Sequence, residues 1–132
     1  MSIQVFTQYL EGIINRDWSL VRPTLSTNVY REGYDGPGDS SEGVDDYMRF
    51  LERSMTPLVG FGYDVHRFVT FADDTIALVE VDSRYEEDGE TFGYRMALVW
   101  HVDDEDLIDR IDVYWKTPAR RLRQDQRREP TS

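Results

Sequence analysis

The sequence predicts an α+β protein in which three N-terminal helices pack on one antiparallel meander sheet. In the first 55 residues, apolar side chains recur at spacings of three and four, which is typical of amphipathic helices. After Pro57 the spacing changes to the alternation of half-buried strands, interrupted by short polar turns. Turns this short join antiparallel neighbours, so the second half of the 132 residues is predicted to be a meander around a single core.

Three helices are predicted from the spacing of apolar side chains and from signals at the helix ends. Residues 3–15 place a stripe of apolar and aromatic side chains on one face. Asp17 is expected to cap a short second helix, which Pro23 would shorten or bend. A third helix is expected over residues 44–55, where apolar and aromatic side chains again share one face.

The extended segments are predicted from alternation and from the turns that separate them. A short strand is expected over residues 28–33, and the Gly, Pro, Asp and Ser residues of 34–43 predict a loop. Four long strands follow, joined by short acidic turns. They are predicted at about residues 62–71, 75–86, 91–102 and 107–116.

The charge of the chain is acidic overall and unevenly distributed. Acidic residues outnumber basic ones by 26 to 15, and a net charge of −11 repels both nucleic acid and anionic membrane surfaces. Neither is an expected partner. From Lys116 onward there are six basic residues and two acidic ones, with little apolar surface to bury. We therefore expect one domain over residues 1–116 and a basic, flexible tail over 117–132; the alternative is an arm lying on an acidic surface of its own or a neighbouring subunit.

The residue types also limit the possible chemistry. There is no cysteine, and the two histidines, His66 and His101, do not have the spacing of a metal site. No disulfide, thiol nucleophile, metal or cofactor is expected, which leaves carboxylates, tyrosines and one imidazole. The N-terminus lacks the pattern of a signal peptide, and no apolar run approaches about 18 residues, so a cytoplasmic protein is the simplest expectation.

Three segments, in their order and spacing, resemble the nuclear transport factor two-like superfamily, which includes ketosteroid isomerases, limonene epoxide hydrolases and SnoaL-like polyketide cyclases. They are the helix of residues 6–18 with its final Asn-x-Asp-aromatic step, the strand 28–33, and Leu-Ile-Asp-Arg-Ile-Asp-Val-Tyr-Trp at 107–115. The resemblance implies a cone-shaped roll with a pocket for a small apolar molecule between the helices and the concave face of the sheet. It also implies a homodimer through the convex face.

Alternation along the last two strands determines which side chains reach that pocket. On 107–116, composition alone would turn the apolar set inward, whereas the resemblance turns Arg110, Asp112 and Tyr114 inward. We follow the resemblance here. The expected pocket lining is then Arg110, Tyr114, Trp100, Leu98, Met96 and Tyr94.

The resemblance implies four catalytic candidates. Asp112 resembles an active-site aspartate of limonene epoxide hydrolases, and an apolar pocket would raise its pKa toward neutral pH. An ion pair with Arg110, or solvent exposure, is the alternative. Tyr9 resembles the oxyanion-hole tyrosine of ketosteroid isomerases, and core packing is its alternative. Tyr30 resembles the tyrosine that holds the nucleophilic water in the epoxide hydrolases, with Glu32 where those enzymes have Asn.

Other charged side chains depart from the superfamily pattern. Glu80 stands where the epoxide hydrolases have an arginine, and alternation turns Glu80, Asp82 and Arg84 outward. His101 is expected on the convex face; the alternative is a bulge that turns it inward to form a dyad with Asp112.

The leading functional hypothesis is a cofactor-free general acid/base enzyme, an isomerase, cyclase or epoxide hydrolase, acting on a small apolar carbonyl or epoxide compound. The alternative is a non-catalytic domain of the same fold that binds a small ligand or serves as a dimeric scaffold. The convex face that would form the dimer is expected to carry Val99, Ala97, Ile111 and Val113.

Overall fold

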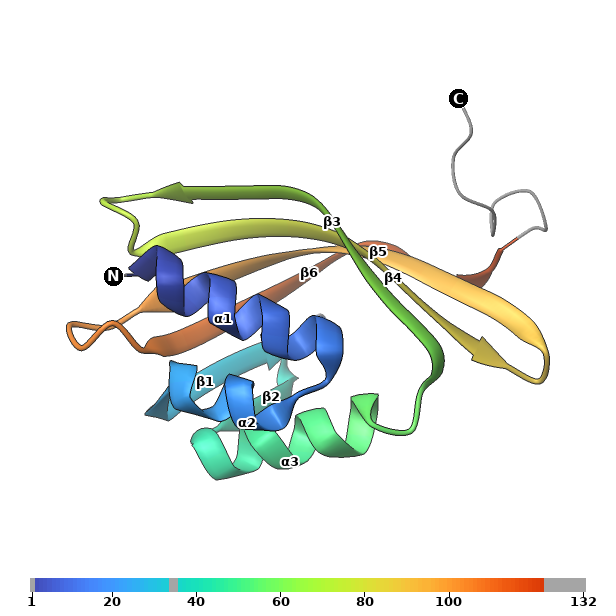
Figure 1. The fold of residues 1–132 in the computed structure, drawn as a ribbon, viewed down its shortest axis with the longest axis horizontal. Helices are drawn as coiled ribbons and strands as arrows, with labels where there is room; N and C mark the ends of the chain where they lie inside the picture. Colours follow the sequence, from blue (N-terminus) through green and yellow to red (C-terminus); the bar gives the residue numbers. More distant parts are fainter. Residues whose placement is uncertain (1, 34–35, 123–132) are drawn as a thin grey trace.

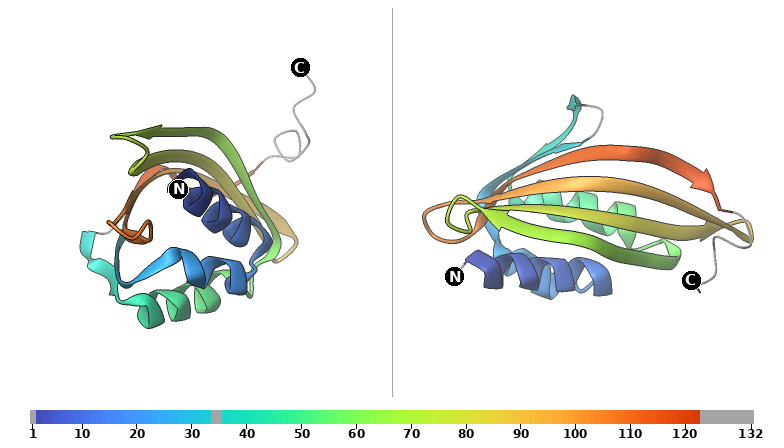
Figure 2. Two further views of the ribbon diagram at one scale, coloured as in Figure 1. Left: turned by 60° about the vertical axis from the view of Figure 1, so that its left-hand side comes forward. Right: turned by 90° about the horizontal axis from the view of Figure 1, so that it is seen from above.

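The computed structural model describes residues 2–33 and 36–122, and it has the α+β architecture predicted from the sequence. Figure 1 shows the helices gathered on one face of a single curved sheet, and Figure 2 shows the long strands extending past the ends of the helices. In chain order the elements are α1 (Ser2–Asn15), α2 (Trp18–Val21), the 3₁₀ helix η1 (Arg22–Thr24), β1 (Leu25–Gly33), β2 (Gly36–Glu42), α3 (Val44–Met55), β3 (Val59–Phe71), β4 (Ile76–Glu87), β5 (Glu90–Val102) and β6 (Ile108–Arg121).

The sheet has the strand order β2-β1-β6-β5-β4-β3. Strands β3 to β6 form the antiparallel meander that the short turns predict. Strand β1 lies between β2 and β6, antiparallel to β2 and parallel to β6. This parallel pair, which alternation and turn lengths do not indicate, places an early strand beside the last one.

Extended structure covers more of the chain than the sequence indicates, and the largest differences are at β2 and β6. The predicted loop over 34–43 contains β2, an edge strand held by backbone pairing with β1. Gly and Pro are tolerated at a sheet edge, because one side of an edge strand makes no backbone hydrogen bonds to a neighbouring strand. Strand β6 continues past the predicted end at residue 116, and Arg121 still pairs with Phe92 of β5. Residues 123–132 of the predicted tail lie outside the described residues.

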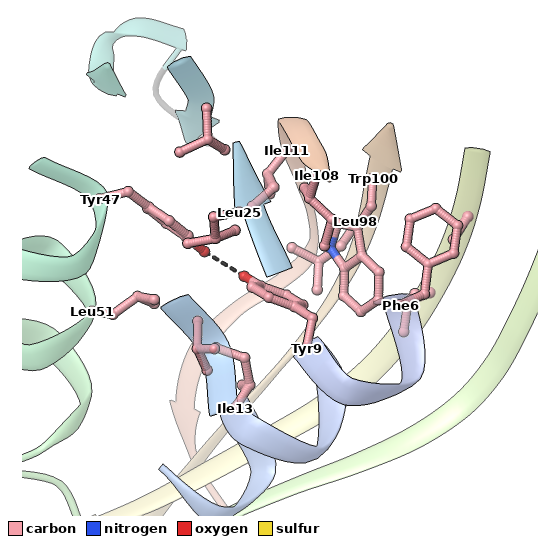
Figure 3. Close-up of a cluster of buried hydrophobic side chains, with 14 of the residues drawn as sticks. Phe6, Tyr9, Ile13, Leu25, Tyr47, Leu51, Leu98, Trp100, Ile108 and Ile111 are labelled. Atoms are coloured by element: carbon pink, nitrogen blue, oxygen red, sulfur yellow. Dashed lines mark hydrogen bonds between the residues drawn. The ribbon is translucent and has the colours of Figure 1, made fainter. Parts of the chain in front are cut away.

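Helix α1 packs its apolar stripe against the centre of the sheet, as the spacing predicts. Phe6, Tyr9 and Ile13 are buried, and the rings of Phe6 and Tyr9 contact Trp100 of β5 at centroid distances of 5.9 and 4.9 Å. Figure 3 shows these side chains between α1, α3 and the sheet. The core therefore lies on the helix-covered face.

The predicted end signals of the second helix are confirmed. Asp17 is the N-cap of α2 and accepts a hydrogen bond from the backbone N–H of Ser19. Pro23 ends the α-helical geometry by lying in η1. Close packing of α1 against α2 depends on Gly12, because a Cβ there would lie 2.5 Å from the Val21 side chain. None of the helices in the described ranges is long and apolar enough to span a membrane.

Candidate functional site

Strand register divides the side chains of β5 and β6 between two faces. Trp100, whose ring contacts α1, pairs with Ile111, and Leu98 pairs with Val113. Residues that pair across antiparallel strands share a face of the sheet. We call the face that carries Trp100 the concave face and the opposite one the outer face. Of the predicted pocket lining, Trp100, Leu98, Met96 and Tyr94 lie on the concave face.

The expectation that Arg110, Asp112 and Tyr114 point inward is wrong. They pair with His101, Val99 and Ala97, which alternate with the concave set on β5 and therefore lie on the outer face. The physical reason is burial. Ile111 and Val113 are 1% and 9% exposed, and covering such side chains is worth about 1.5–3 kcal/mol each, whereas burying a guanidinium is costly. On this strand, composition predicts the orientation correctly and the resemblance does not.

Four of the residues that the resemblance selects do come together, but on the outer face. Asp112 forms a two-point ion pair with Arg110, with both N···O distances 2.9 Å, which was the alternative interpretation of its charge. Tyr30 donates to Glu32 at 3.1 Å, and the Arg110 guanidinium lies 5.1 Å from the Tyr30 ring centroid. Glu32 is the register partner of Asp112. This cluster does not face Tyr9 or Trp100, so the arrangement does not support a pocket role for it.

The prediction of which residues lie on the outer face is also partly wrong. Ala97 and Val99 lie there as predicted, but Ile111 and Val113 belong to the core. His101 is on the outer face, as the alternation of β5 indicates.

Charged side chains of β4 point outward from the sheet, as alternation predicts. Glu80 contacts Arg67 at 3.0 Å, and Asp82 contacts Arg95 at 2.7 Å. Hydrogen bonds from Arg95 hold the pKa of Asp82 below its usual value. Arg84 pairs with Asp64 in the same way. These charges are satisfied within the chain.

The most distinctive polar feature of the concave side is a pair of buried phenols. Tyr9 of α1 and Tyr47 of α3 point toward each other, and their hydroxyl oxygens are 2.5 Å apart (Figure 3). Burial raises the pKa of both phenols, so both remain protonated at neutral pH. Only one of the two O–H groups can donate to the other. Within the described residues the remaining phenol proton has no acceptor, so it is available to an oxygen atom of a ligand.

The pair continues into a row of phenols along the concave face. Tyr63 of β3 and Tyr94 of β5 are both register partners of Ser83 on β4, so the three lie across adjacent strands on one face. Burial raises the pKa of Tyr63 and Tyr94, and Tyr63 influences the pKa of Tyr9 electrostatically. We call Tyr47, Tyr9, Tyr63 and Tyr94 the phenol row.

Aromatic rings line the concave face where it extends past the helices. Tyr94 packs on Trp115 with ring centroids 4.5 Å apart, and Tyr85 stacks on Phe92 at 5.7 Å. All four side chains are half-buried, in contrast to the sealed core around Trp100. Beside them is an open, mostly apolar depression of about 210 Å³. It is lined by Trp115, Lys116, Thr117, Pro118 and Ala119.

The site consists of donors and apolar surface. The indole N–H of Trp100 is buried without a hydrogen-bond acceptor in the described part of the chain. No carboxylate of residues 2–33 or 36–122 hydrogen-bonds to the phenol row. No group of three or more His, Asp or Glu side chains in these ranges is placed to hold a metal ion. Such a site can bind and polarise an oxygen atom of a ligand.

The sequence singled out Tyr9 as a candidate but did not indicate Tyr47 or Tyr63. Tyr47 lies on the apolar stripe of a helix, where an aromatic side chain usually means packing. The signal that could have found it is its polar end, because a buried tyrosine hydroxyl normally needs a partner.

The curved sheet with helices on its concave side is the fold of the nuclear transport factor two-like superfamily. Residues 6–111 match the SnoaL-like domain of that superfamily. The chain therefore belongs to the SnoaL-like family. No curated protein matches the sequence.

Solved structures agree with this fold. A candidate ketosteroid isomerase of Kribbella flavida superposes with a TM-score of 0.73 at 20% identity, covering 98% of this chain and 90% of that one. An LEH-like epoxide hydrolase of M. tuberculosis gives 0.71 at 21% identity, over 87% of this chain and 78% of that one. A candidate polyketide cyclase of Xanthomonas campestris gives 0.70 at 19% identity, over 87% and 90%. At such identities the likeness establishes the fold.

Proposed function

We propose that this protein binds a small, largely apolar molecule with a ring system and an acceptor oxygen on the concave face. The aromatic rings around Tyr94 and Trp115 would pack on the ring system, and the phenol row would donate to the oxygen. The observation that carries the proposal is the buried Tyr9–Tyr47 pair, which leaves one phenol proton without an acceptor in the described residues. An unused buried donor is costly unless a ligand or water satisfies it.

A second candidate function is cofactor-free catalysis on a carbonyl or epoxide compound, as an isomerase, cyclase or epoxide hydrolase. The observation that favours it is the same phenol pair, because a protonated donor in a dry site binds an oxygen more strongly as charge develops on it. The solved structures named for such reactions share only the fold. Asp112, on the outer face, is not proposed as the base.

The binding proposal is tested by replacing one concave tyrosine and one outer tyrosine. Compounds that co-purify with the protein would be identified by native mass spectrometry, and the affinity of each would be measured by calorimetry. Tyr94→Ala should weaken binding by roughly tenfold, because it removes both a stacking ring and a donor. Tyr114→Ala, on the outer face and 57% exposed in the wild-type chain, should leave the affinity unchanged. Equal losses in both variants would contradict the proposal.

We also propose a homodimer in which the outer faces of two copies meet. The outer face carries a band of exposed and half-buried apolar side chains, which a second copy would cover. They are Val69, Phe71, Ile76, Leu78, Ala97, Val99 and Tyr114. Light scattering should give about twice the chain mass of 15.5 kDa, and Val99→Asp should give the single-chain mass. A wild-type protein that is monomeric at micromolar concentration would exclude the dimer.

A further inference from the structure

Arg31 is a charged side chain that the sheet turns toward the concave face. It lies on β1 in register with Ile111 of β6, which in turn pairs with Trp100, so the three share one face. Its side chain is only 11% exposed. A guanidinium that has lost most of its water normally needs several close acceptors in exchange.

The described residues provide few such acceptors. One guanidinium nitrogen is 3.3 Å from a carboxylate oxygen of Asp39, longer than the roughly 2.7–2.9 Å of a close charge-assisted hydrogen bond. The guanidinium also lies 4.0 Å from the Phe50 ring centroid, a cation–π contact that accepts no hydrogen bond. Arginine has several N–H donors in a planar fork. Most of those on Arg31 have no acceptor within residues 2–33 and 36–122.

A second polar group beside Arg31 also lacks a hydrogen-bond partner. Ser41 of β2 is the register partner of Arg31 and shares its face of the sheet. Its hydroxyl is buried and has no hydrogen-bond partner in the described part of the chain. A guanidinium fork and a neighbouring hydroxyl can together bind both oxygens of a carboxylate.

This corner of the concave face adjoins the phenol row. Arg31 lies over Phe50, and the Phe50 ring stacks on Tyr47 with centroids 6.2 Å apart and ring planes 15° apart. The positive charge of Arg31 also lowers the pKa of Tyr9 and Tyr47, against the larger effect of their burial. Arg31 and the phenol pair therefore both border Phe50, at one corner of the concave face.

We propose that Arg31 and Ser41 bind a carboxylate, so that the ligand of the concave face is an organic acid with a flat apolar body. The inference rests on the proposed binding function and specifies the class of ligand. The competing possibility is that Arg31 only ties β2 to α3 through Asp39 and Phe50.

The experiment compares matched acids and amides. Benzoate and benzamide, 2-naphthoate and 2-naphthamide, and anthracene-9-carboxylate with its amide differ within each pair only in the charged group. Their affinities would be measured by isothermal titration calorimetry at pH 7. Wild-type protein should bind at least one acid roughly tenfold more tightly than its amide, because a charge-assisted two-point contact forms only with the acid.

The variants separate ligand binding from a structural role. Arg31→Met should abolish the preference for the acid and leave the amide affinity unchanged, whereas Arg31→Lys should retain part of the preference. Ser41→Ala, which removes only an unused hydroxyl, should weaken acid binding several-fold without lowering the midpoint of thermal unfolding. Two exposed residues provide matched controls: Ser40→Ala, on the outer face beside Ser41, and Arg49→Met, on α3. Neither should change any affinity.

Each result bears on the inference. Equal affinity for acid and amide in every pair, no binding of any acid, or a preference that survives Arg31→Met would overturn it. A loss of unfolding midpoint in Arg31→Met with the acid preference intact would show that Arg31 is a structural tether. If amides and acids bind the wild type equally well, the carboxylate inference is wrong but the proposed binding function is still supported. The two proposals can therefore be distinguished.

Discussion

Replacing Trp100 by alanine should lower the free energy of unfolding by about 3–5 kcal/mol, the cost of deleting a large, fully buried ring. Trp100 is 1% exposed and contacts the rings of Phe6, Tyr9 and Phe68. Removing it would leave a cavity between α1 and the sheet that the surrounding side chains can only partly fill. Urea unfolding followed by circular dichroism measures the change.

The control for this prediction is Ile14→Ala, on α1 and outside both the core and the proposed dimer face, with 39% of its surface exposed. It should cost less than about 1 kcal/mol, because little apolar surface is lost from the interior. A Trp100→Ala variant as stable as the Ile14→Ala variant would contradict the assignment of Trp100 to the centre of the core.

Removing both hydroxyls of the phenol pair should lower the free energy of unfolding by less than the sum of the two single removals. Tyr9→Phe leaves the Tyr47 hydroxyl buried without its partner, and the expected loss is about 1–3 kcal/mol of unfolding free energy. Tyr47→Phe should behave in the same way. In the double variant no buried hydroxyl is left alone, so its loss should be clearly smaller than the sum of the single losses.

The same variants test the pair as a ligand contact. Tyr9→Phe, with its fold confirmed by circular dichroism, should weaken binding of the co-purified compound by roughly tenfold if the phenol proton is donated to it. Additive unfolding losses in the double variant would argue against the hydrogen bond. An unchanged ligand affinity would argue against the contact with the ligand.

Local patterns predicted the elements that depend on local physics. The stripe of α1, the Asp17 cap and the antiparallel order of β3 to β6 depend on neighbouring residues and short turns, and the structure confirms each of them. Strand β2 was not predictable in this way. Its Gly, Pro and Ser residues have turn propensity, and the segment is extended because β1 pairs with it.

The orientation of β6 shows how a resemblance can mislead where composition does not. Asp112 occupies a strand position that resembles a catalytic one, but one step of alternation separates the outer face from the concave face. The pairing of Ile111 with Trp100 and of Val113 with Leu98, on the helix-covered face, decides between the two orientations. The alternating apolar set on residues 107–116 carried this information, so the sequence alone predicts the correct face.

The polar groups of the concave face were less predictable because each depends on a distant partner. Tyr9 and Tyr47 are 38 residues apart in the chain, and neither position differs locally from a packing aromatic. Arg31 follows a residue that the resemblance singles out, yet its inward orientation and its pairing with Ser41 become evident only from the register of β1.

The parallel pairing of β1 with β6 has a consequence for how the protein is made. β1 precedes the meander in the chain, but its partner on one side, β6, is the last of the described strands to be synthesised. Until β6 is available, the β1–β2 hairpin cannot pair with the rest of the sheet. A two-stranded hairpin alone is marginally stable in water. Because Arg31 and Ser41 lie on that hairpin while Trp100 lies on the meander, the concave face assembles only after nearly the whole domain has been synthesised.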